Sequence, residues 1–378
     1  MSPKIKYPNQ FFFTTFGYVH VHYNSMKGKQ PDQPGGVKEI ARRAKVSIAT
    51  VDRVIHNRTG VSAKTRARIE KIIQELNYQP NIIASRLASR KVLNLAILLP
   101  AVSTETDYWE ILLAGVSQAE DEIRQMGVRI ERYYYDFNDR TSFPKAARQL
   151  LKGPLDGVLL APLFVDEATA FCAQLQEKNV PYVFINSDIP SLGSLCYVGP
   201  ELFRSGYLAA HLMAYCLQPG DKILMVNMTK EIEGLHPLLR KEEGFRAYFG
   251  EKPDRIVKTD VPESNGKTIE RKVAEALAAD ASIKAIFVTS SRVHLIAQFL
   301  ESAGKKDILV MGYDFLPENV SWLQKGMIDF LICQKPQEQA YRGIMTLYQH
   351  LVLGAPVEKE HFMPIDIITR ENHMYYKN

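Results

Sequence analysis

Several aromatic and polar side chains stand where predicted strands end and loops begin. Tyr108 and Trp109 follow Leu95–Pro100, a continuous apolar run that is typical of a strand buried on both faces. Two later strand patterns end at Asp136 and at Asn186. Ligands of parallel α/β sheets bind outside the carboxyl ends of the strands. We therefore take these four residues as candidates for a ligand site.

The types of these residues indicate the chemistry of the ligand. An aromatic side chain such as Trp109 can pack against a sugar ring, and carboxylate and amide groups suit hydroxyls, which both donate and accept hydrogen bonds. Gln334, at the last predicted crossing between two lobes, adds a further amide. Arg240 and Arg292 instead favour a phosphorylated or acidic ligand, because guanidinium groups pair with such anions. Both interpretations stay open.

Each candidate also has a purely structural interpretation. Trp109 can belong to the hydrophobic core, Asp136 can stabilise a turn, and Asn186 can form an Asx-turn. Arg240 can pair with a glutamate on its own helix. The geometry of the folded chain distinguishes these alternatives.

No arrangement of residues that is typical of catalysis is found in the sequence. The chain has no GxGxxG, Walker A, GxSxG or HExxH motif, and its nine histidines are scattered. The four cysteines, at positions 172, 196, 216 and 333, form no CxxC pair, so we expect reduced core residues in a cytoplasmic protein. The sequence therefore predicts a protein that is not an enzyme and that has no metal site and no cofactor.

The elements that would position the ligand site alternate in type. From Leu93 onward, apolar runs alternate with amphipathic helical patterns, which indicates βαβ units and parallel sheets covered on both faces. The predicted strands are 95–100, 128–136, 157–162, 181–187, 222–228, 255–261, 283–289, 308–313, 327–333 and one near 362–369. The predicted helices are 108–126, 143–152, 166–178, 202–217, 237–249, 267–280, 294–303, 317–325 and 337–353. The expected fold is α/β, with two doubly wound lobes and no membrane span.

A different pattern occupies residues 37–80. Val37–Ala44 and Ile48–Ile55 are short amphipathic helices, and Ser47 is placed to cap the second of them. Ser62 caps a third helix, whose apolar face is Ile69, Ile72, Ile73 and Leu76. Such a helix-turn-helix unit places its second helix in the major groove of DNA. That helix turns Val51, Val54 and Ile55 inward and leaves Ile48, Ala49, Asp52 and Arg53 outside.

The distribution of charge supports DNA binding. Residues 37–91 contain 13 Lys and Arg and 4 Asp and Glu, a net charge of +9. Residues 1–36 carry +3 and the whole chain carries +5, so residues 92–378 carry −7. A basic head on an acidic body is expected of a polyanion-binding module joined to a domain that must not bind the polyanion.

Residues 1–36 match neither pattern. The run Phe11–Phe16 follows two lysines, but it is too short for a signal peptide and no small-residue cleavage site follows it. We expect a disordered extension, or a start codon assigned too early with Met26 as the true start. The predicted domains are this extension, a head at 37–80, a hinge at 81–91, and a domain for ligand binding and dimerisation at 92–378.

At the head the chain resembles the lactose-repressor (LacI/GalR) family of bacterial transcription regulators. The matching residues are Glu39-Ile40-Ala41, Ala44-Lys45-Val46-Ser47, Thr50-Val51, Arg53-Val54, Val61-Ser62-Ala63-Lys64-Thr65 and Leu76-Asn77-Tyr78-Gln79-Pro80-Asn81, running on to Ala84 and Leu87. Three positions depart from the family pattern, since Lys45 replaces a turn glycine, Asp52 a serine and His56 an asparagine. The element order of residues 92–378 is similar to the type I periplasmic sugar-binding-protein fold of the family's effector domain.

The resemblance implies which residues contact DNA. Around the recognition helix they are Ser47, Ile48, Ala49, Thr50, Asp52, Arg53, His56 and Asn57. Residues 81–91 correspond to a hinge helix that folds when the dimer sits on its operator, with Ala84 and Leu87 at the minor groove. Leu87 would be an apolar wedge that bends the DNA. The alternative for this segment is a plain linker.

The resemblance also adds to the ligand site. Gly312-Tyr313-Asp314 matches a family strand that ends in an effector-binding aspartate, and Arg240 precedes Gly244-Phe245, close to where relatives place a ligand-contacting arginine. Ser290-Ser291-Arg292 departs from the Asn-Asp pair that many relatives carry. The effector-binding candidates are Tyr108, Trp109, Asp136, Asn186, Arg240, Arg292, Asp314 and Gln334.

The function expected from these observations is that of a cytoplasmic, homodimeric transcription regulator, a repressor in its simplest form. It would bind a pseudo-palindromic double-stranded DNA operator, since one recognition helix contacts too few bases for specificity. A small ligand, a sugar or a sugar derivative, would control it. Two alternatives stay open: an activator or co-repressor-dependent regulator of the same architecture, and a ligand-binding protein without DNA function.

Overall fold

The computed structural model describes residues 36–55, 57–78, 92–103, 106–228, 236–250, 252–261 and 266–378. The chain divides into two compact units, Met1–Asn81 and Ile82–Asn378, and each is described by itself. Across these described ranges, no helix combines the length and the apolar character needed to cross a membrane.

The head is a small bundle of three helices. They are α1 (Val37–Ala44), α2 (Ile48–Ile55) and α3 (Ala63–Glu75). Both predicted caps are confirmed, because Ser47 Oγ accepts a hydrogen bond from the Thr50 amide at 3.2 Å and Ser62 Oγ accepts one from the Thr65 amide at 3.3 Å. The buried core consists of Ile40, Ala41, Ala44, Val51, Val54, Ile69 and Ile72.

The turn between α1 and α2 contains a strained residue. Lys45 has φ 51° and ψ 49°, in the left-handed region. A side chain with a Cβ atom pays a steric cost of about 1–2 kcal/mol there, whereas glycine does not. The replacement of the family's turn glycine by Lys45 therefore places a residue with a Cβ atom in this region, and the helix-turn-helix forms in spite of the cost.

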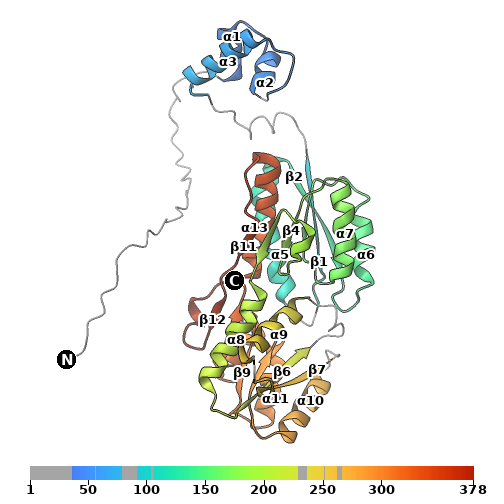
Figure 1. Cartoon of the computed structure of the whole chain (residues 1–378), viewed down its shortest axis with the longest axis vertical. Coiled ribbons are helices and arrows are strands. Elements are labelled where there is room, and N and C mark those ends of the chain that lie inside the picture. The colour runs from blue at the N-terminus through green and yellow to red at the C-terminus, as the bar shows by residue number, and fades with distance from the viewer. Residues whose placement is uncertain are drawn as a thin grey trace, which may run out of the picture. The chain divides into compact units, whose positions relative to one another are not determined.

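One of the two lobes of the second unit, here called the N lobe, is built on a sheet in the order β11-β5-β4-β3-β1-β2, with all neighbours parallel. Helices α5 and α13 cover one face of this sheet, and α6 and α7 cover the other (Figure 1). The strands are β1 (Leu93–Pro100), β2 (Val128–Tyr135), β3 (Gly157–Leu160), β4 (Tyr182–Ile185), β5 (Cys196–Gly199) and β11 (Glu360–Phe362). The helices are α5 (Tyr108–Ile123), α6 (Ser142–Leu150), α7 (Val165–Glu177) and α13 (Pro336–Tyr348).

The other lobe, here called the C lobe, contains a sheet in the order β12-β10-β9-β8-β6-β7. Helices α8 and α9 pack on one face, and α10, α11 and α12 pack on the other. The strands are β6 (Lys222–Met228), β7 (Ile256–Val261), β8 (Ile283–Val288), β9 (Leu309–Tyr313), β10 (Phe330–Cys333) and β12 (Asp366–Ile368). The helices are α8 (Leu202–Cys216), α9 (His236–Phe249), α10 (Gly266–Ala279), α11 (Val293–Ser302) and α12 (Pro317–Gln324).

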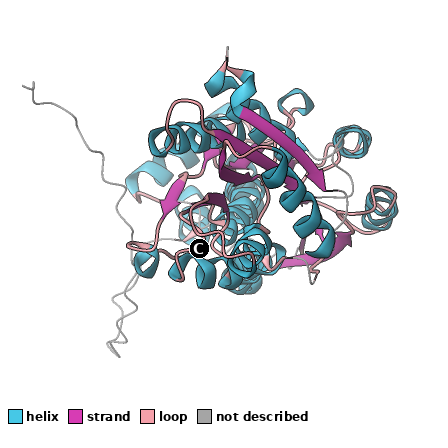
Figure 2. Cartoon of the chain, turned by 90° about the horizontal axis from the view of Figure 1, so that it is seen from below, coloured by secondary structure: helices cyan, strands magenta, loops and turns pink. Residues whose placement is uncertain are grey.

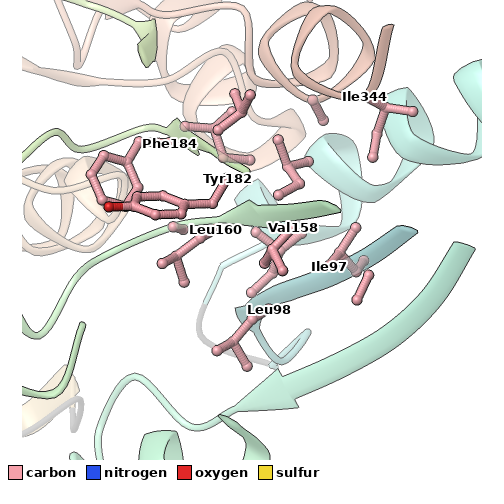
Figure 3. Close-up of a cluster of buried hydrophobic side chains, with 14 of the residues drawn as sticks. Ile97, Leu98, Val158, Leu160, Tyr182, Phe184 and Ile344 are labelled. Atoms are coloured by element: carbon pink, nitrogen blue, oxygen red, sulfur yellow. The ribbon is translucent and has the colours of Figure 1, made fainter. Parts of the chain in front are cut away.

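The strands lie among the helices (Figure 2), as expected of parallel sheets that are covered on both faces. Ile97 and Leu98 of β1 are both fully buried, although successive side chains of a strand point to opposite faces. Val158 and Leu160 of β3 lie in the same cluster, together with Ile344 of α13 (Figure 3). The prediction that the first strand is buried on both faces is confirmed.

The α/β class and the alternation of elements are confirmed, and four details were wrong. β5 was not predicted. The expected strand near 362–369 is two short strands, β11 and β12, in different sheets. β12 runs antiparallel to β10, so the C-lobe sheet is not wholly parallel. Cys216, at the end of α8, is exposed rather than in the core, whereas Cys172, Cys196 and Cys333 are buried.

Lys45→Gly should stabilise the head by about 0.5–1 kcal/mol, because glycine adopts a positive φ without the Cβ clash. Amide hydrogen exchange of α1 and α3 in the full chain measures this change. Lys71→Gly, in the interior of α3, is the matched control and should destabilise the head by about 1 kcal/mol. Faster exchange in both variants would show that the turn is not strained.

Candidate functional site

A cavity with an empty volume of about 670 Å³, part of it open solvent, lies in the second unit. Its size is typical of a site for a small ligand. It is lined from both lobes by Thr106, Tyr108, Trp109, Phe137, Leu163, Asn186, Met228, Pro237, Leu238, Lys241, Thr289, Ser290, Ser291, Arg292, Asp314 and Gln334. Six of the eight residues expected in the effector site are therefore brought together, and Asp136 and Arg240 are not.

Asp314 lies at the end of β9 in an unusual backbone conformation, with φ 73°. Its carboxylate is buried, and Oδ1 accepts a hydrogen bond from Gln334 Nε2 at 2.7 Å. Burial raises the pKa of Asp314 to about 6, against the Lys241 ammonium and the Gln334 hydrogen bond, which both lower it. The site thus holds a buried carboxyl group that is largely ionised near pH 7.5 and becomes protonated below about pH 6.

Lys241 was not predicted, and it lines the cavity together with Pro237 and Leu238 of the same helix, α9. Its Nζ lies 3.6 Å from the centre of the Tyr313 ring and donates to the Thr289 carbonyl at 3.3 Å. Burial lowers the pKa of Lys241 to about 8, although the Asp314 carboxylate acts in the opposite direction. Helical periodicity could have identified it, because Leu238 and Phe245, at spacings of three and four, share its buried face.

Arg240 does not line the cavity and instead pairs with a glutamate on its own helix, which was its structural alternative. Its guanidinium forms an ion pair with Glu243 on the same helix and lies 5.4 Å from the centre of the Phe203 ring. It borders a different hollow, together with His236 and Glu360. The neighbour of Arg240, rather than Arg240 itself, lies where the sequence comparison expected a ligand-contacting cation.

Asp136 does not line the cavity either, and it instead stabilises a turn, which was its structural alternative. It is exposed, and its Oδ1 accepts a hydrogen bond from the Asn138 amide at 2.8 Å, as in an Asx-turn. Phe137 lines the cavity instead. The alternation of β2 could have indicated this, because Tyr135 and Phe137 share one parity and both are buried.

A chain of hydrogen bonds connects the ligand-site residues of the two lobes. The side-chain Nδ2 of Asn186 donates to Tyr108 Oη at 2.6 Å, and the backbone N–H of Asn186 donates to Gln339 Oε1 at 3.0 Å. Gln339 Nε2 then donates to the Gln334 carbonyl at 2.7 Å. The side chain of Gln334 in turn donates from Nε2 to Asp314 Oδ1. This series of hydrogen bonds therefore extends across both lobes.

Two polar atoms at the cavity are buried with no hydrogen-bond partner in the described part of the chain. They are Gln334 Oε1 and Ser290 Oγ. A buried polar atom without a partner costs about 1–3 kcal/mol. A ligand that offers hydrogen-bond donors and acceptors would remove this cost, so the cavity suits a polar molecule.

Other lining residues contribute packing and contact between the lobes. Arg292 is buried, and its Nη2 donates to the Met228 carbonyl. Thr106 Oγ1 and Ser291 Oγ, from different lobes, are 2.9 Å apart. Trp109 is both a lining residue and a member of the N-lobe core. The described ranges contain no group of three or more His, Cys, Asp or Glu placed to hold a metal ion.

In the head, α2 presents the side chains expected at DNA. Ile48 is 50% exposed, and Ala49 and Arg53 are exposed as well. The Ser47 and Thr50 hydroxyls lie 2.9 Å apart within the cap. The outward face of α2 is therefore open to a macromolecular partner.

Two other residues predicted at DNA have partners inside the head. Asp52 Oδ2 pairs with Arg58 Nη1 at 3.2 Å, and Asn57 Oδ1 accepts from Arg66 Nη1 at 3.1 Å. These contacts favour the interpretation that Asp52 and Asn57 orient the arginine side chains that they contact. His56, the predicted hinge 81–91, and with it Ala84 and Leu87, lie outside the described residues.

Asp314→Asn should raise the free energy of unfolding of the ligand-free protein near pH 7.5 by about 1–3 kcal/mol. Between about pH 4 and pH 6 the folded chain holds a proton on Asp314 that the unfolded chain has released. Wild-type stability therefore falls as the pH rises through this window, and the full cost is present above it. Chemical denaturation should show the gain of the variant near pH 7.5 and its disappearance near pH 4.

Asp136→Asn is the control for this prediction, since Asp136 is exposed and asparagine can accept the same backbone hydrogen bond. It should leave stability unchanged at both pH values. An equal gain in both variants would assign the effect to net charge rather than to burial.

Residues 36–81 match the model of bacterial regulatory proteins of the lacI family, and residues 96–355 match that of a periplasmic binding protein domain. Catabolite control protein A of Staphylococcus aureus is 39% identical over 127 residues, which cover 32% of this chain and 36% of that relative. The chain thus aligns with about a third of the length of that relative.

Solved structures resemble the second unit. A protein from Bacteroides fragilis, assigned as a LacI transcriptional regulator, is 27% identical with a TM-score of 0.71, covering 76% of this chain and 100% of the other. A solute-binding protein of an ABC transporter from Burkholderia graminis, solved with D-arabinose, is 18% identical with a TM-score of 0.67, covering 76% and 99%. The first match supports the same family, and the second shows a common fold. This chain belongs, over residues 96–355, to the family of periplasmic binding protein domains, and its head at residues 36–81 matches the lacI family of bacterial regulatory proteins.

Proposed function

We propose that the chain is a transcription regulator, a repressor, whose binding to an operator is controlled by a carbohydrate ligand. The observation that carries this proposal is the combination, on one chain, of a basic helix-turn-helix head with a cavity that holds a buried carboxylate and amide pair, Asp314 and Gln334. Such a protein acts by binding alone, without catalysis.

The head and the predicted hinge support DNA as the partner. Together they carry a net charge of +9 over residues 37–91, which suits a polyanion, and such binding weakens steeply with salt. The exposed Ile48 and Ala49 on α2 can contact thymine methyl groups, and Arg53 can bond guanine or phosphate. A homodimer, in the cytoplasm, would place two such helices in successive major grooves of a pseudo-palindrome.

The cavity supports a carbohydrate as the ligand. Carboxylate and amide groups bond vicinal hydroxyls well, and Trp109 offers an aromatic face. The Burkholderia graminis protein of the same fold was solved with D-arabinose. Asp314, Gln334, Tyr108 and Asn186 are the residues we assign to hydroxyl recognition.

Control requires that the ligand bind two arrangements of the lobes unequally. The chain of hydrogen bonds from Tyr108 through Gln339 to Asp314 spans both lobes, so ligand contacts at its two ends would favour one arrangement. In a repressor this arrangement would disfavour ordering of the hinge at residues 81–91, and the operator would be released.

Selection from a random double-stranded library should yield one pseudo-palindrome, bound tightly and with a strong salt dependence. A thermal-shift screen of neutral sugars, sugar phosphates and uronic acids then identifies ligands, which should release the selected operator. Asp314→Ala should keep operator affinity but lose both the thermal shift and the release, because each charged hydrogen bond contributes about 1.5–3 kcal/mol. Failure to select any palindrome would contradict DNA regulation, whatever the cavity binds.

Asp52→Ser should raise affinity for random DNA and relax discrimination at one base pair of each half-site. The Asp52 carboxylate is repelled by phosphates, and its pairing with Arg58 holds that guanidinium in place. A mismatch at a specified pair normally costs about 1–3 kcal/mol. Glu75→Ser, the same charge change on α3, is the control and should leave the selected consensus unchanged. An identical consensus for Asp52→Ser would show that Asp52 does not affect base choice.

A further inference from the structure

The cavity has two chemically different sides. Trp109, Phe137, Leu163 and Leu238 line it, and all four belong to the hydrophobic cluster of the N lobe. Leu238 comes from α9 of the C lobe and completes this surface, here called the apolar wall. Each of the four side chains is at least nine-tenths buried. None of them except the Trp109 indole can form a conventional hydrogen bond.

The polar groups of the lining gather on other elements. Asp314 and Gln334 follow β9 and β10, and Ser290 follows β8. Among the residues that line the cavity, Gln334 Oε1 and Ser290 Oγ are buried atoms that have no hydrogen-bond partner in the described part of the chain. Tyr108 and Asn186 are connected to Gln334 through Gln339, so recognition of ligand hydroxyls is concentrated at this end of the cavity, here called the polar end.

A fully hydroxylated hexose fits this division poorly. It carries hydroxyls around the ring and one on C6, so with its ring hydroxyls at the polar end another hydroxyl would face the apolar wall. That hydroxyl would lose its hydrogen bonds to water and gain none from the wall. A methyl group at the same place would instead gain from burial.

We propose that the ligand is a deoxy sugar of the 6-deoxyhexose type, with its methyl group against the apolar wall and its ring hydroxyls at the polar end. This inference rests on the proposed carbohydrate control and narrows it to one class of sugar. A methyl glycoside could present the same chemistry, so methyl glycosides form a separate arm of the test.

Isothermal titration of the full chain with matched pairs tests the proposal. The probes are L-fucose against L-galactose, L-rhamnose against L-mannose, and D-fucose against D-galactose, which differ within each pair only by the C6 hydroxyl. Methyl β-D-galactoside against D-galactose is the glycoside arm. In at least one deoxy pair the 6-deoxy sugar should bind at least tenfold more tightly, which corresponds to about 1.4 kcal/mol. The glycoside arm should show no comparable preference.

Leu238→Asn should reduce that ratio at least threefold by giving the wall a hydrogen-bonding group, with the melting temperature recorded to verify folding. Leu353→Asn, at a position that is 40% exposed, is the control and should keep the wild-type ratio. Gln334→Leu should weaken both members of a pair by similar factors, because it removes the polar end and leaves the wall intact.

Equal or tighter binding of the hydroxylated members in every pair would overturn the proposal and leave carbohydrate control standing. A preference confined to the methyl glycoside would also overturn it. If no sugar of the panel binds, the proposal fails, and if the wider screen of sugars fails as well, carbohydrate control fails with it. An unchanged ratio in a folded Leu238→Asn protein would show that the wall does not carry the selectivity.

Discussion

The ligand site depends on a close backbone contact between α8 and α9. A Cβ atom on Gly206 would lie 1.9 Å from the Lys241 carbonyl oxygen, and one on Gly244 would lie 1.9 Å from the Phe203 carbonyl oxygen. No side chain can stand between the two helices at these points, so the rotation of α9 about its axis is fixed. That rotation places Leu238 and Lys241 at the cavity and Arg240 outside it.

This constraint explains where sequence analysis succeeded and where it failed at the site. The strand-end rule correctly located Asn186 at the cavity, because the carboxyl ends of parallel strands meet at one edge. The resemblance to the family correctly located Asp314 there. It failed at Asp136, where the alternation of the strand directs Phe137 inward. Similarity to relatives suggested Arg240, yet the buried face of α9, marked by Leu238 and Phe245, includes Lys241. Helical periodicity identifies which of two adjacent residues lies on the buried face of a helix, whereas a match of sequence position to relatives does not.

The limits of the fold prediction have a similar origin. Long elements such as α5 and β1 have patterns that are visible within their own residues. β5 and β11 are four and three residues long, and the residues that pair between them are 163 positions apart in the sequence. Such short segments form strands because the edge strand beside them offers hydrogen-bond partners, and the pattern of their own residues does not indicate that pairing. Cys216 is the last residue of α8 and is exposed, which the apolar pattern of the helix did not indicate.

Several costs to stability are concentrated at the cavity. Asp314 combines a positive φ with a buried carboxylate, Lys241 is a buried ammonium, and Gln334 keeps an unpartnered oxygen. In a protein selected only for stability, apolar residues of similar volume would be expected at such positions. A ligand that bonds these groups recovers part of each cost in the arrangement that it binds, and only there. The instability of the empty site and the ability of a ligand to shift the lobes therefore have one physical origin.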